Sequence, residues 1–202
     1  MPPVISDADL WSEMKSGSEK AFSSLFMKYH VSLVSYGKSI TQHHYIVGDC
    51  IQDVFADIWL YRKTISTPDS VRAYLLSGLR KRIARKLERD QIFKHATDIE
   101  HVEFSASFTV LDELITNEEM RSQVTYLNAA INQLSPRQKE ALYLRYYQQL
   151  SVDQIAEMMQ MNTQSVSNLL HRAIKQLRNL WKGEIPQLMI LLVLTHCLST
   201  DV

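Results

Sequence analysis

Glycine and proline are scarce in this chain of 202 residues, with five of each. Sheet-rich proteins depend on these residues for their many tight turns, so the scarcity argues against a fold built from short strands. Hydrophobic residues make up 46% of the chain and charged residues 22%, the ordinary proportions of a globular protein. The composition therefore favours an all-α fold.

Cysteine is also rare, because only Cys50 and Cys197 are present. They form no CxxC pair, and two residues cannot build the disulfide framework of a small secreted scaffold. The first eleven residues lack a basic stretch followed by an apolar run, so they do not have the form of a secretory signal. These absences predict a cytoplasmic protein with unpaired thiols.

Motifs for catalysis and metal binding are missing as well. The chain contains no GxSxG, HExxH, phosphate-binding loop or GxGxxG. The two adjacent histidines at 43 and 44 have no matching ligand, and the carboxylates of Asp49, Asp53 and Asp57 form one acidic stripe without a converging partner. We predict that the chain is not an enzyme and holds no metal ion or other cofactor.

Neither sign of charge dominates, since 22 basic and 22 acidic residues cancel. The charges are nevertheless segregated. Residues 72–90 carry seven basic and two acidic side chains, and residues 132–182 carry seven and three, whereas residues 91–131 between them carry two and seven. Two basic blocks suit two surfaces that face a polyanion, although solvated helix faces produce the same pattern.

Hydrophobic periodicity predicts a helical domain over residues 6–91. Ser18 is placed as the N-cap of "EKAFSSLFMKYH", in which apolar residues recur at the spacing of an amphipathic helix. The same period runs through "YIVGDCIQDVFADIWLYR" and "SVRAYLLSGLRKRIARKLERD". The acidic, aperiodic residues 92–117 that follow are interpreted as a linker.

A second helical domain is predicted over residues 118–182. Within it Ser135, Pro136 and Gln138 have the pattern of an N-cap, a first-turn proline and a capping box. Further on, Ser151 and Asn162 are placed to cap two short helices separated by a few residues.

Two short helices joined in this way are the sequence form of a helix-turn-helix. The turn position that often holds glycine is Gln160, so either this residue adopts a positive φ or the turn differs. The second helix keeps a polar outward face, whose amides can pair with base edges while its cations neutralise phosphates. An ordinary helical hairpin with a solvated face is the alternative. The candidate DNA-contact residues of this helix are Thr163, Gln164, Ser167, Asn168, His171, Arg172 and Lys175.

A second candidate nucleic-acid surface ends the first domain, in "RKRIARKLERD". Its positive potential suits phosphates, although cations near a helix C-terminus also complement the helix dipole. Trp59, Tyr61 and Tyr74 lie near this block and can stack on unpaired bases, or belong to the core. The candidate residues of this surface are Tyr61, Arg80, Lys81, Arg82, Arg85, Lys86 and Arg89.

The last segment, residues 183–202, is a hydrophobic tail. Residues 188–194 are seven consecutive apolar residues, too few to span a bilayer, so we predict no membrane span. Left in water, this run would expose apolar surface on every side. We expect it either to fill a groove on the second domain or to pack between the two domains and hold them closed.

Taken together, these stretches resemble a known family. The run "GDCIQDVF" with "IWLYR" and "YLLSGLRKRIARKLER" is similar to region 2 of bacterial sigma factors of the extracytoplasmic-function group. The stretch from "LNAAINQLSPRQKEALYLRYY" through "SVDQIAEMMQMNTQSVSNLLHRAIKQL" resembles region 4 of the same group. The resemblance covers about residues 18–90 and 125–180. The short linker and leucine-rich C-terminus resemble most the iron-transport-regulator-like members of gut-type Bacteroidetes.

The resemblance implies two small helical domains, a sigma region 2 bundle and a region 4 helix-turn-helix, joined by the acidic linker. It implies a sigma factor that binds core RNA polymerase, through the β′ clamp helices and the β subunit, and directs promoter-specific transcription initiation. The basic surface would melt the downstream promoter element, and the second domain would read the upstream element. An anti-sigma factor is a further implied partner. The implied polymerase-binding residues are Asp49, Gln52, Asp53 and Phe55.

The chain departs from the family pattern at several of these positions. Lys81 stands where the family usually has Asn, and Gly48 where it usually has Glu. Ser167 and Leu169 replace recognition-helix positions that are often basic. From the residues alone, two alternatives remain: a stand-alone dimeric helix-turn-helix regulator, and a membrane-surface regulator held by the tail.

Overall fold

The computed structural model describes residues 5–41, 43–93 and 118–180. All regular elements among these residues are helices, which confirms the all-α fold. The chain divides into two compact units, residues 1–103 and residues 104–202, and each is considered by itself.

Two predicted segments fall largely or wholly outside the described residues. These are the linker over 92–117, of which only the first two residues are described, and the tail over 183–202. The first two residues of the predicted linker belong to the last helix of the first unit, which ends at Phe93. The predicted domain boundaries and the packing of the tail stay predictions.

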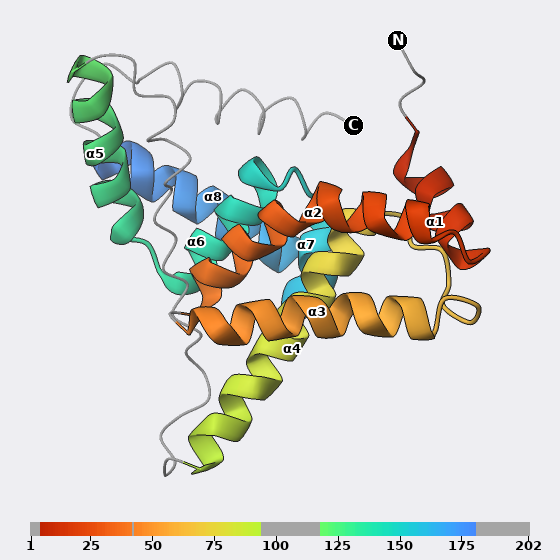
Figure 1. Cartoon of the computed structure of the whole chain (residues 1–202). Coiled ribbons are helices and arrows are strands. Elements are labelled where there is room, and N and C mark those ends of the chain that lie inside the picture. Colours follow the sequence, from red (N-terminus) through yellow and green to blue (C-terminus); the bar gives the residue numbers. More distant parts are fainter. Residues whose placement is uncertain (1–4, 42, 94–117, 181–202) are drawn as a thin grey trace. The chain divides into compact units, whose positions relative to one another are not determined.

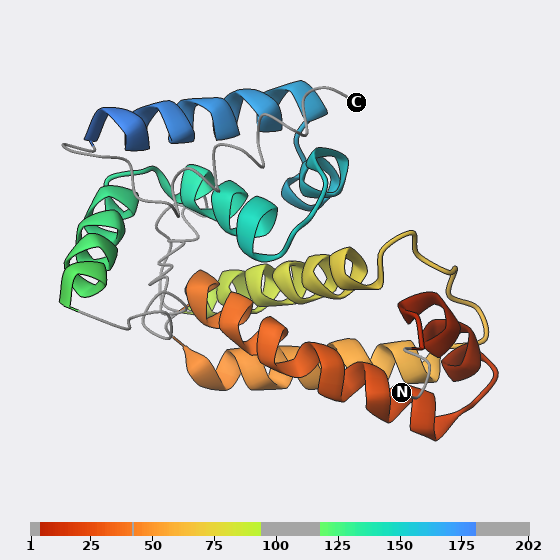
Figure 2. The ribbon, with the colours of Figure 1, turned by 90° about the horizontal axis from the view of Figure 1, so that it is seen from above.

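The first unit is a helical bundle. Its described helices are α1 (Asp7–Lys15), α2 (Glu19–Ile40), α3 (His44–Leu60) and α4 (Val71–Phe93). Helix α4 crosses α3, and its C-terminal part projects beyond it (Figure 1). Helix α2 packs against both α3 and α4, as the view from above also shows (Figure 2).

The N-terminal ends of α1 and α2 are set by serine caps. Ser18 caps α2 as predicted, because its Oγ accepts a hydrogen bond from the Ala21 N–H at 3.2 Å. Ser6 caps α1, and Asp9 at the third helical position closes a capping box. Each cap satisfies a backbone N–H group that the helix itself leaves without an acceptor.

The centre of the first unit is apolar and tightly packed. Trp11 and Met14 of α1 are completely buried, and the edge of the Tyr74 ring meets Trp11 with ring centres 5.3 Å apart. Gly37 of α2 lies against Val47 of α3, where a Cβ atom would come within 2.4 Å of the valine Cγ1. The close crossing of α2 and α3 therefore requires glycine at this position. The other side chains buried most completely in this unit are Leu25, Leu33, Tyr36, Ile46, Ile51, Leu75, Leu76, Leu79 and Ile83.

The second unit is built from short helices. Its described elements are α5 (Glu118–Asn132), α6 (Pro136–Leu142), the π-helix η2 (Tyr143–Tyr147), α7 (Val152–Met159) and α8 (Thr163–Leu180). Helix α8 packs on α5, α6 and α7. The element that no sequence pattern predicted is η2, a single wide turn that continues α6.

Helix α6 begins with the predicted capping box. The Gln138 N–H donates to Ser135 Oγ at 3.4 Å, and the Ser135 N–H donates to Gln138 Oε1 at 2.9 Å. Pro136 occupies the first helical position, where its missing N–H costs nothing. The sequence pattern and the local structure agree here because the cap involves only neighbouring residues.

Candidate nucleic-acid interface

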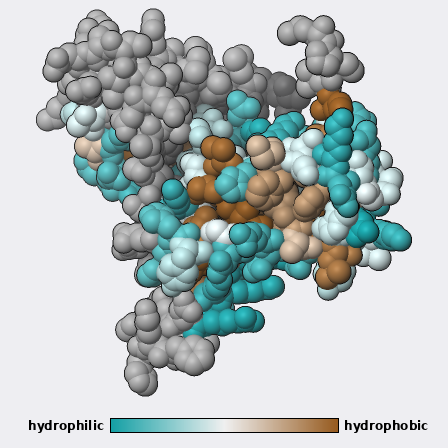
Figure 3. Space-filling view, viewed as in Figure 1, coloured by the Kyte–Doolittle hydropathy of each residue, from teal (hydrophilic) through white to brown (hydrophobic). Residues whose placement is uncertain are grey.

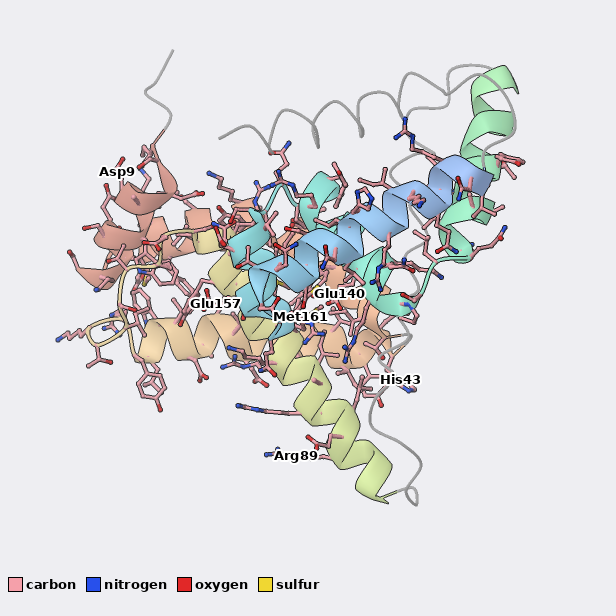
Figure 4. The ribbon with its side chains drawn as sticks, turned by 180° about the vertical axis from the view of Figure 1, so that it is seen from behind. Asp9, His43, Arg89, Glu140, Glu157 and Met161 are labelled. Atoms are coloured by element: carbon pink, nitrogen blue, oxygen red, sulfur yellow. The ribbon has the colours of Figure 1, made fainter. Side chains whose placement is uncertain are left out.

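Helices α7 and α8 form the predicted pair with a tight turn between them. Helix α7 ends at Gln160, which adopts the left-handed conformation with φ 55° and ψ 46°. The turn is closed by the Met161 N–H, which donates to the Ala156 carbonyl oxygen at 2.9 Å. Of the two alternatives for Gln160, the positive φ is correct. Figure 4 labels Glu157 in α7 and Met161 in this turn.

Helix α8 starts with the predicted asparagine cap. Asn162 Oδ1 accepts a hydrogen bond from the Ser165 N–H at 2.7 Å. The inner face of the helix is fully buried, and its buried residues are Val166, Leu170, Ala173 and Leu177. Burial of this face orients the opposite, polar face toward solvent.

The predicted DNA-contact residues lie on that outer side of α8. Gln164 and Asn168 are exposed one turn apart, and the Gln164 Nε2 donates to Asn168 Oδ1 at 3.2 Å. Thr163 donates through Oγ1 to Asp153 of α7 at 3.2 Å. Because a helix has 3.6 residues per turn, the seven predicted positions share one side. All are exposed except Ser167, which is half-buried; the exposed ones are Thr163, Gln164, Asn168, His171, Arg172 and Lys175.

The basic block of the first unit lies on α4. Lys81, Arg85 and Arg89 are exposed and follow one another at intervals of one turn. Arg89 extends from the part of α4 that projects beyond α3 (Figure 4). These three cations make no ion pair among the residues that the structure describes. Arg80, on another side of the helix, is half-buried.

The remaining two cations of the block are held by α3. Lys86 Nζ lies 2.8 Å from Asp49 Oδ2, and Arg82 is paired with Asp57. The hydrogen bond from Lys86 to Asp49 raises the pKa of the lysine. The acidic stripe and the basic block, predicted as separate surfaces, therefore adjoin.

The predicted polymerase-binding residues divide into two groups. Asp49, Gln52 and Asp53 are exposed on α3. Phe55 is only 4% exposed and its ring lies 5.0 Å from that of Phe26. Phe55 is therefore a core residue and offers no contact surface in this structure, so its place among the polymerase-binding residues is corrected. In the sequence Phe55 stands between Asp53 and Asp57 of the acidic stripe, and this position does not show which way its side chain points.

Aromatic side chains near the basic block differ in their freedom to stack. Trp59 lies under the Arg62 guanidinium, 4.3 Å from the ring centre, and against Phe22. Tyr74 contacts Trp11. Tyr61, at the end of α3, is 55% exposed. Tyr74 is nevertheless 38% exposed, so Tyr61 is the most open of the three aromatic residues considered.

One surface feature escaped the sequence analysis. Met27 and Val31, one turn apart on α2, are the most exposed large apolar side chains among the described residues. Figure 3 shows apolar side chains gathered over α2 and α3. The sequence contains one indication of this exposure, because Met27 and Val31 both lie outside the buried stripe of α2.

The residues that the structure describes form neither a metal centre nor a membrane span. No three His, Cys, Asp or Glu side chains within the described ranges come together as metal ligands. In the part of the chain that the structure describes, every helix is too short or too polar to cross a bilayer. Cys50 is buried between α3 and its neighbours, and burial raises the pKa of its thiol.

Comparison with known proteins bears directly on the helix pair α7 and α8. The family described as Sigma-70, region 4 matches residues 125–177, which include α6, η2, α7 and most of α8. RNA polymerase sigma factor SigV of Bacillus subtilis (strain 168) is 27% identical over 144 residues, which cover 71% of this chain and 78% of the relative. The chain is thus similar to sigma factors of the extracytoplasmic-function group, and its residues 125–177 match their region 4.

Two solved structures of sigma factors share the fold of this chain. CnrH, in complex with the cytosolic domain of CnrY, has 19% sequence identity and a TM-score of 0.56, and the match covers 86% of this chain and 96% of that one. The sigma factor RpoE, in complex with the anti-sigma factor NepR from Bartonella quintana, has 17% identity and a TM-score of 0.56, with 82% and 99% covered. The finer resemblance to iron-transport-regulator-like members stays a prediction.

Proposed function

We propose that this sigma factor works in the cytoplasm by binding core RNA polymerase and directing it to specific promoters. The observation that carries the proposal is the helix-turn-helix of α7 and α8, with its buried inner face and polar outer face, inside the segment that matches Sigma-70 region 4. A helix of this kind enters the major groove and reads base edges with its first residues. Gln164 and Asn168 are the amides so placed.

The first unit carries the proposed polymerase contact and the downstream DNA contact. The exposed carboxylates of Asp49 and Asp53, with Gln52 beside them, suit a basic surface such as we propose for the β′ clamp helices. The exposed cations of α4 and the open ring of Tyr61 suit a separated DNA strand, whose phosphates attract cations and whose bases stack on aromatic rings. The acidic linker would then follow a basic channel of the polymerase.

An anti-sigma factor is the further partner that we propose. Support comes from the two matched solved structures, which contain CnrH bound to the cytosolic domain of CnrY and RpoE bound to the anti-sigma factor NepR. The exposed apolar residues Met27 and Val31 are a candidate part of such an interface, because contiguous apolar surface marks protein-interaction sites.

The test is to mix the purified chain with core RNA polymerase and with duplex DNA containing candidate promoters. We expect the chain to bind the polymerase in the absence of DNA and to bind duplex DNA only weakly in the absence of polymerase. Initiation should require the chain, the polymerase and the promoter DNA together. A stand-alone dimeric regulator, the main alternative, would bind an operator tightly without polymerase and would not associate with it. Gel filtration with core polymerase and a run-off transcription assay separate these outcomes.

A further inference from the structure

The ion pairs between α3 and α4 connect the two surfaces of the first unit. Asp49 is paired with Lys86, and Asp57 with Arg82. The carboxylates lie two turns apart on α3 and the cations one turn apart on α4, in opposite order along the chain. Asp49 is proposed to meet the polymerase and Asp57 belongs to the same acidic stripe, whereas both cations lie on the helix proposed to meet DNA.

Both pairs are open to competition. The side chains of Asp49 and Asp57 are 59% and 53% exposed, so their carboxylates are largely in water and accessible to another cation. Ion pairs at such positions are weak and are screened by salt, so a surface of high opposite charge can exchange for either partner. The raised pKa of Lys86 reflects its contact with Asp49 and disappears when the carboxylate turns to another partner.

The neighbouring charges of the same helices are not held in this way. Asp53 lies between the paired carboxylates on α3 and makes no ion pair among the described residues. On α4, Arg85 stands directly before Lys86 and likewise makes none within the described ranges. Asp53 and Arg85 thus differ from the four charges that are paired with each other across the two helices.

We infer that the Asp49–Lys86 and Asp57–Arg82 pairs couple polymerase binding to DNA binding. A basic polymerase surface that takes the carboxylates releases Lys86 and Arg82 to the phosphates of the promoter, and DNA that takes the cations releases the carboxylates to the polymerase. This reciprocity is required of any coupling between two binding equilibria. The inference rests on the proposed function and adds to it a reason to expect that the free protein binds DNA weakly.

The first experiment frees the cations in the absence of polymerase. The full-length variants Asp49→Asn and Asp49→Asn/Asp57→Asn are titrated with a fluorescent single-stranded DNA of random sequence at several salt concentrations. Each cation that gains a phosphate steepens the slope of log binding constant against log salt concentration by about 0.7. The slope of the double variant, which frees two cations, should therefore be steeper than that of the wild type by about 1.4. Adding Lys86→Gln to Asp49→Asn should remove the gain of that single variant.

The matched control is Asp53→Asn, which removes the same charge from the same helix face without freeing a cation. The DNA affinity of Asp53→Asn reports the effect of removing one negative charge from the protein. The slope of its log binding constant against log salt concentration should stay close to that of the wild type. Equal slopes for Asp49→Asn and Asp53→Asn would overturn the inference. The substituted carboxylates are exposed and Lys86 is half-buried, so thermal unfolding of each variant verifies that the bundle is intact.

The second experiment frees a carboxylate and measures core-polymerase affinity. Lys86→Gln releases Asp49, so it should bind core polymerase several-fold more tightly than its matched control Arg85→Gln, which removes the same charge from an unpaired neighbour. Equal affinities would overturn the coupling even if the wild type binds polymerase well. A wild type that does not bind polymerase would instead contradict the proposed function, so the two failures are distinguishable.

Discussion

At the scale of single residues, two glutamines of the second unit adopt a backbone conformation that is unusual for residues other than glycine. Gln149 and Gln160 have positive φ angles of 56° and 55°, and they stand on either side of α7. A residue with a Cβ atom is disfavoured in that conformation, which glycine adopts freely. The helix-turn-helix therefore carries local backbone strain at both ends of its first helix.

Replacing Gln160 with glycine should stabilise the second unit. We expect Gln160→Gly to raise the free energy of unfolding by up to about 1 kcal/mol, because the strain exceeds the added chain entropy of glycine. The matched control Gln160→Ala removes the same exposed side chain but keeps the Cβ atom, so it should bring no gain. Urea denaturation followed by circular dichroism measures both, and a gain for alanine equal to that for glycine would contradict the strain argument.

Asp7 makes the stability of the first unit depend on pH. It accepts hydrogen bonds from Lys28, at 2.6 Å, and from the Tyr29 hydroxyl. Burial alone would raise the pKa of Asp7, but these hydrogen bonds outweigh it and hold the pKa below its usual value. Burial, followed by the hydrogen bond to Asp7 and the charge of its carboxylate, raises the pKa of Tyr29.

The sign of the pH effect follows from the lowered pKa. Protons bind the unfolded Asp7 at a higher pH than the folded one, so its contribution is present above the unfolded pKa and is lost as pH falls through the folded pKa. We expect the thermal midpoint of Asp7→Asn to lie below that of the wild type at pH 7, and the difference to shrink on acidification below about pH 4. A difference that stays constant with pH would show that the carboxylate charge is not involved.

At the scale of secondary structure, the close crossing of α2 and α3 depends on one glycine. A Cβ atom at Gly37 would meet the stiff, branched side chain of Val47 at 2.4 Å. We expect Gly37→Ala to lower the free energy of unfolding by about 1–3 kcal/mol, the usual cost of overpacking. Denaturant unfolding of the full chain measures the loss.

Gly48, one residue after Val47, provides the control for this prediction. No atom lies within 4 Å of a Cβ built there, and the position is exposed in the second turn of α3. Gly48→Ala should therefore stabilise the helix by about 0.5–1 kcal/mol, since alanine is the better helix former. The second substitution Val47→Ala should recover part of the stability lost in Gly37→Ala; no recovery would show that Val47 is not the clashing group.

At the scale of the whole molecule, promoter recognition combines contacts of two kinds on α8. Asn168 lies near the start of the helix and should meet base edges, whereas Lys175 lies two turns further on and should meet phosphate. We expect Lys175→Ala to weaken transcription from all cognate promoters alike. Asn168→Ala should instead change which upstream sequences are preferred, with a cost of about 1–3 kcal/mol at the affected base pair.

A promoter library transcribed with core polymerase measures both effects together. The wild type and the two variants are compared by sequencing the transcripts. An unchanged sequence preference for Asn168→Ala would contradict its assignment to the bases. A changed preference for Lys175→Ala, in turn, would contradict its assignment to the phosphate backbone.

Much of the architecture was predictable because it depends on neighbours in the chain. The caps at Ser18, Ser135 and Asn162 involve hydrogen bonds across three residues, and amphipathic periods are repeated every turn. The all-α fold and the helix-turn-helix therefore followed from local patterns. The sequence leaves two conformations open at Gln160, and the structure shows that its φ is positive.

Residue spacing alone predicts which segments are helices, where several of them begin and which faces are polar, since each of these depends on short-range contacts. The packing of helices against one another is needed to show that Phe55 is buried against Phe26, that Gly37 must be glycine, and that Lys86 is held by Asp49. These facts join residues 10 to 37 positions apart, on helices whose crossing angle and rotation no local pattern specifies. The π-helix belongs to the same class, because its wide turn has no signature in residue spacing and forms within the packed second unit.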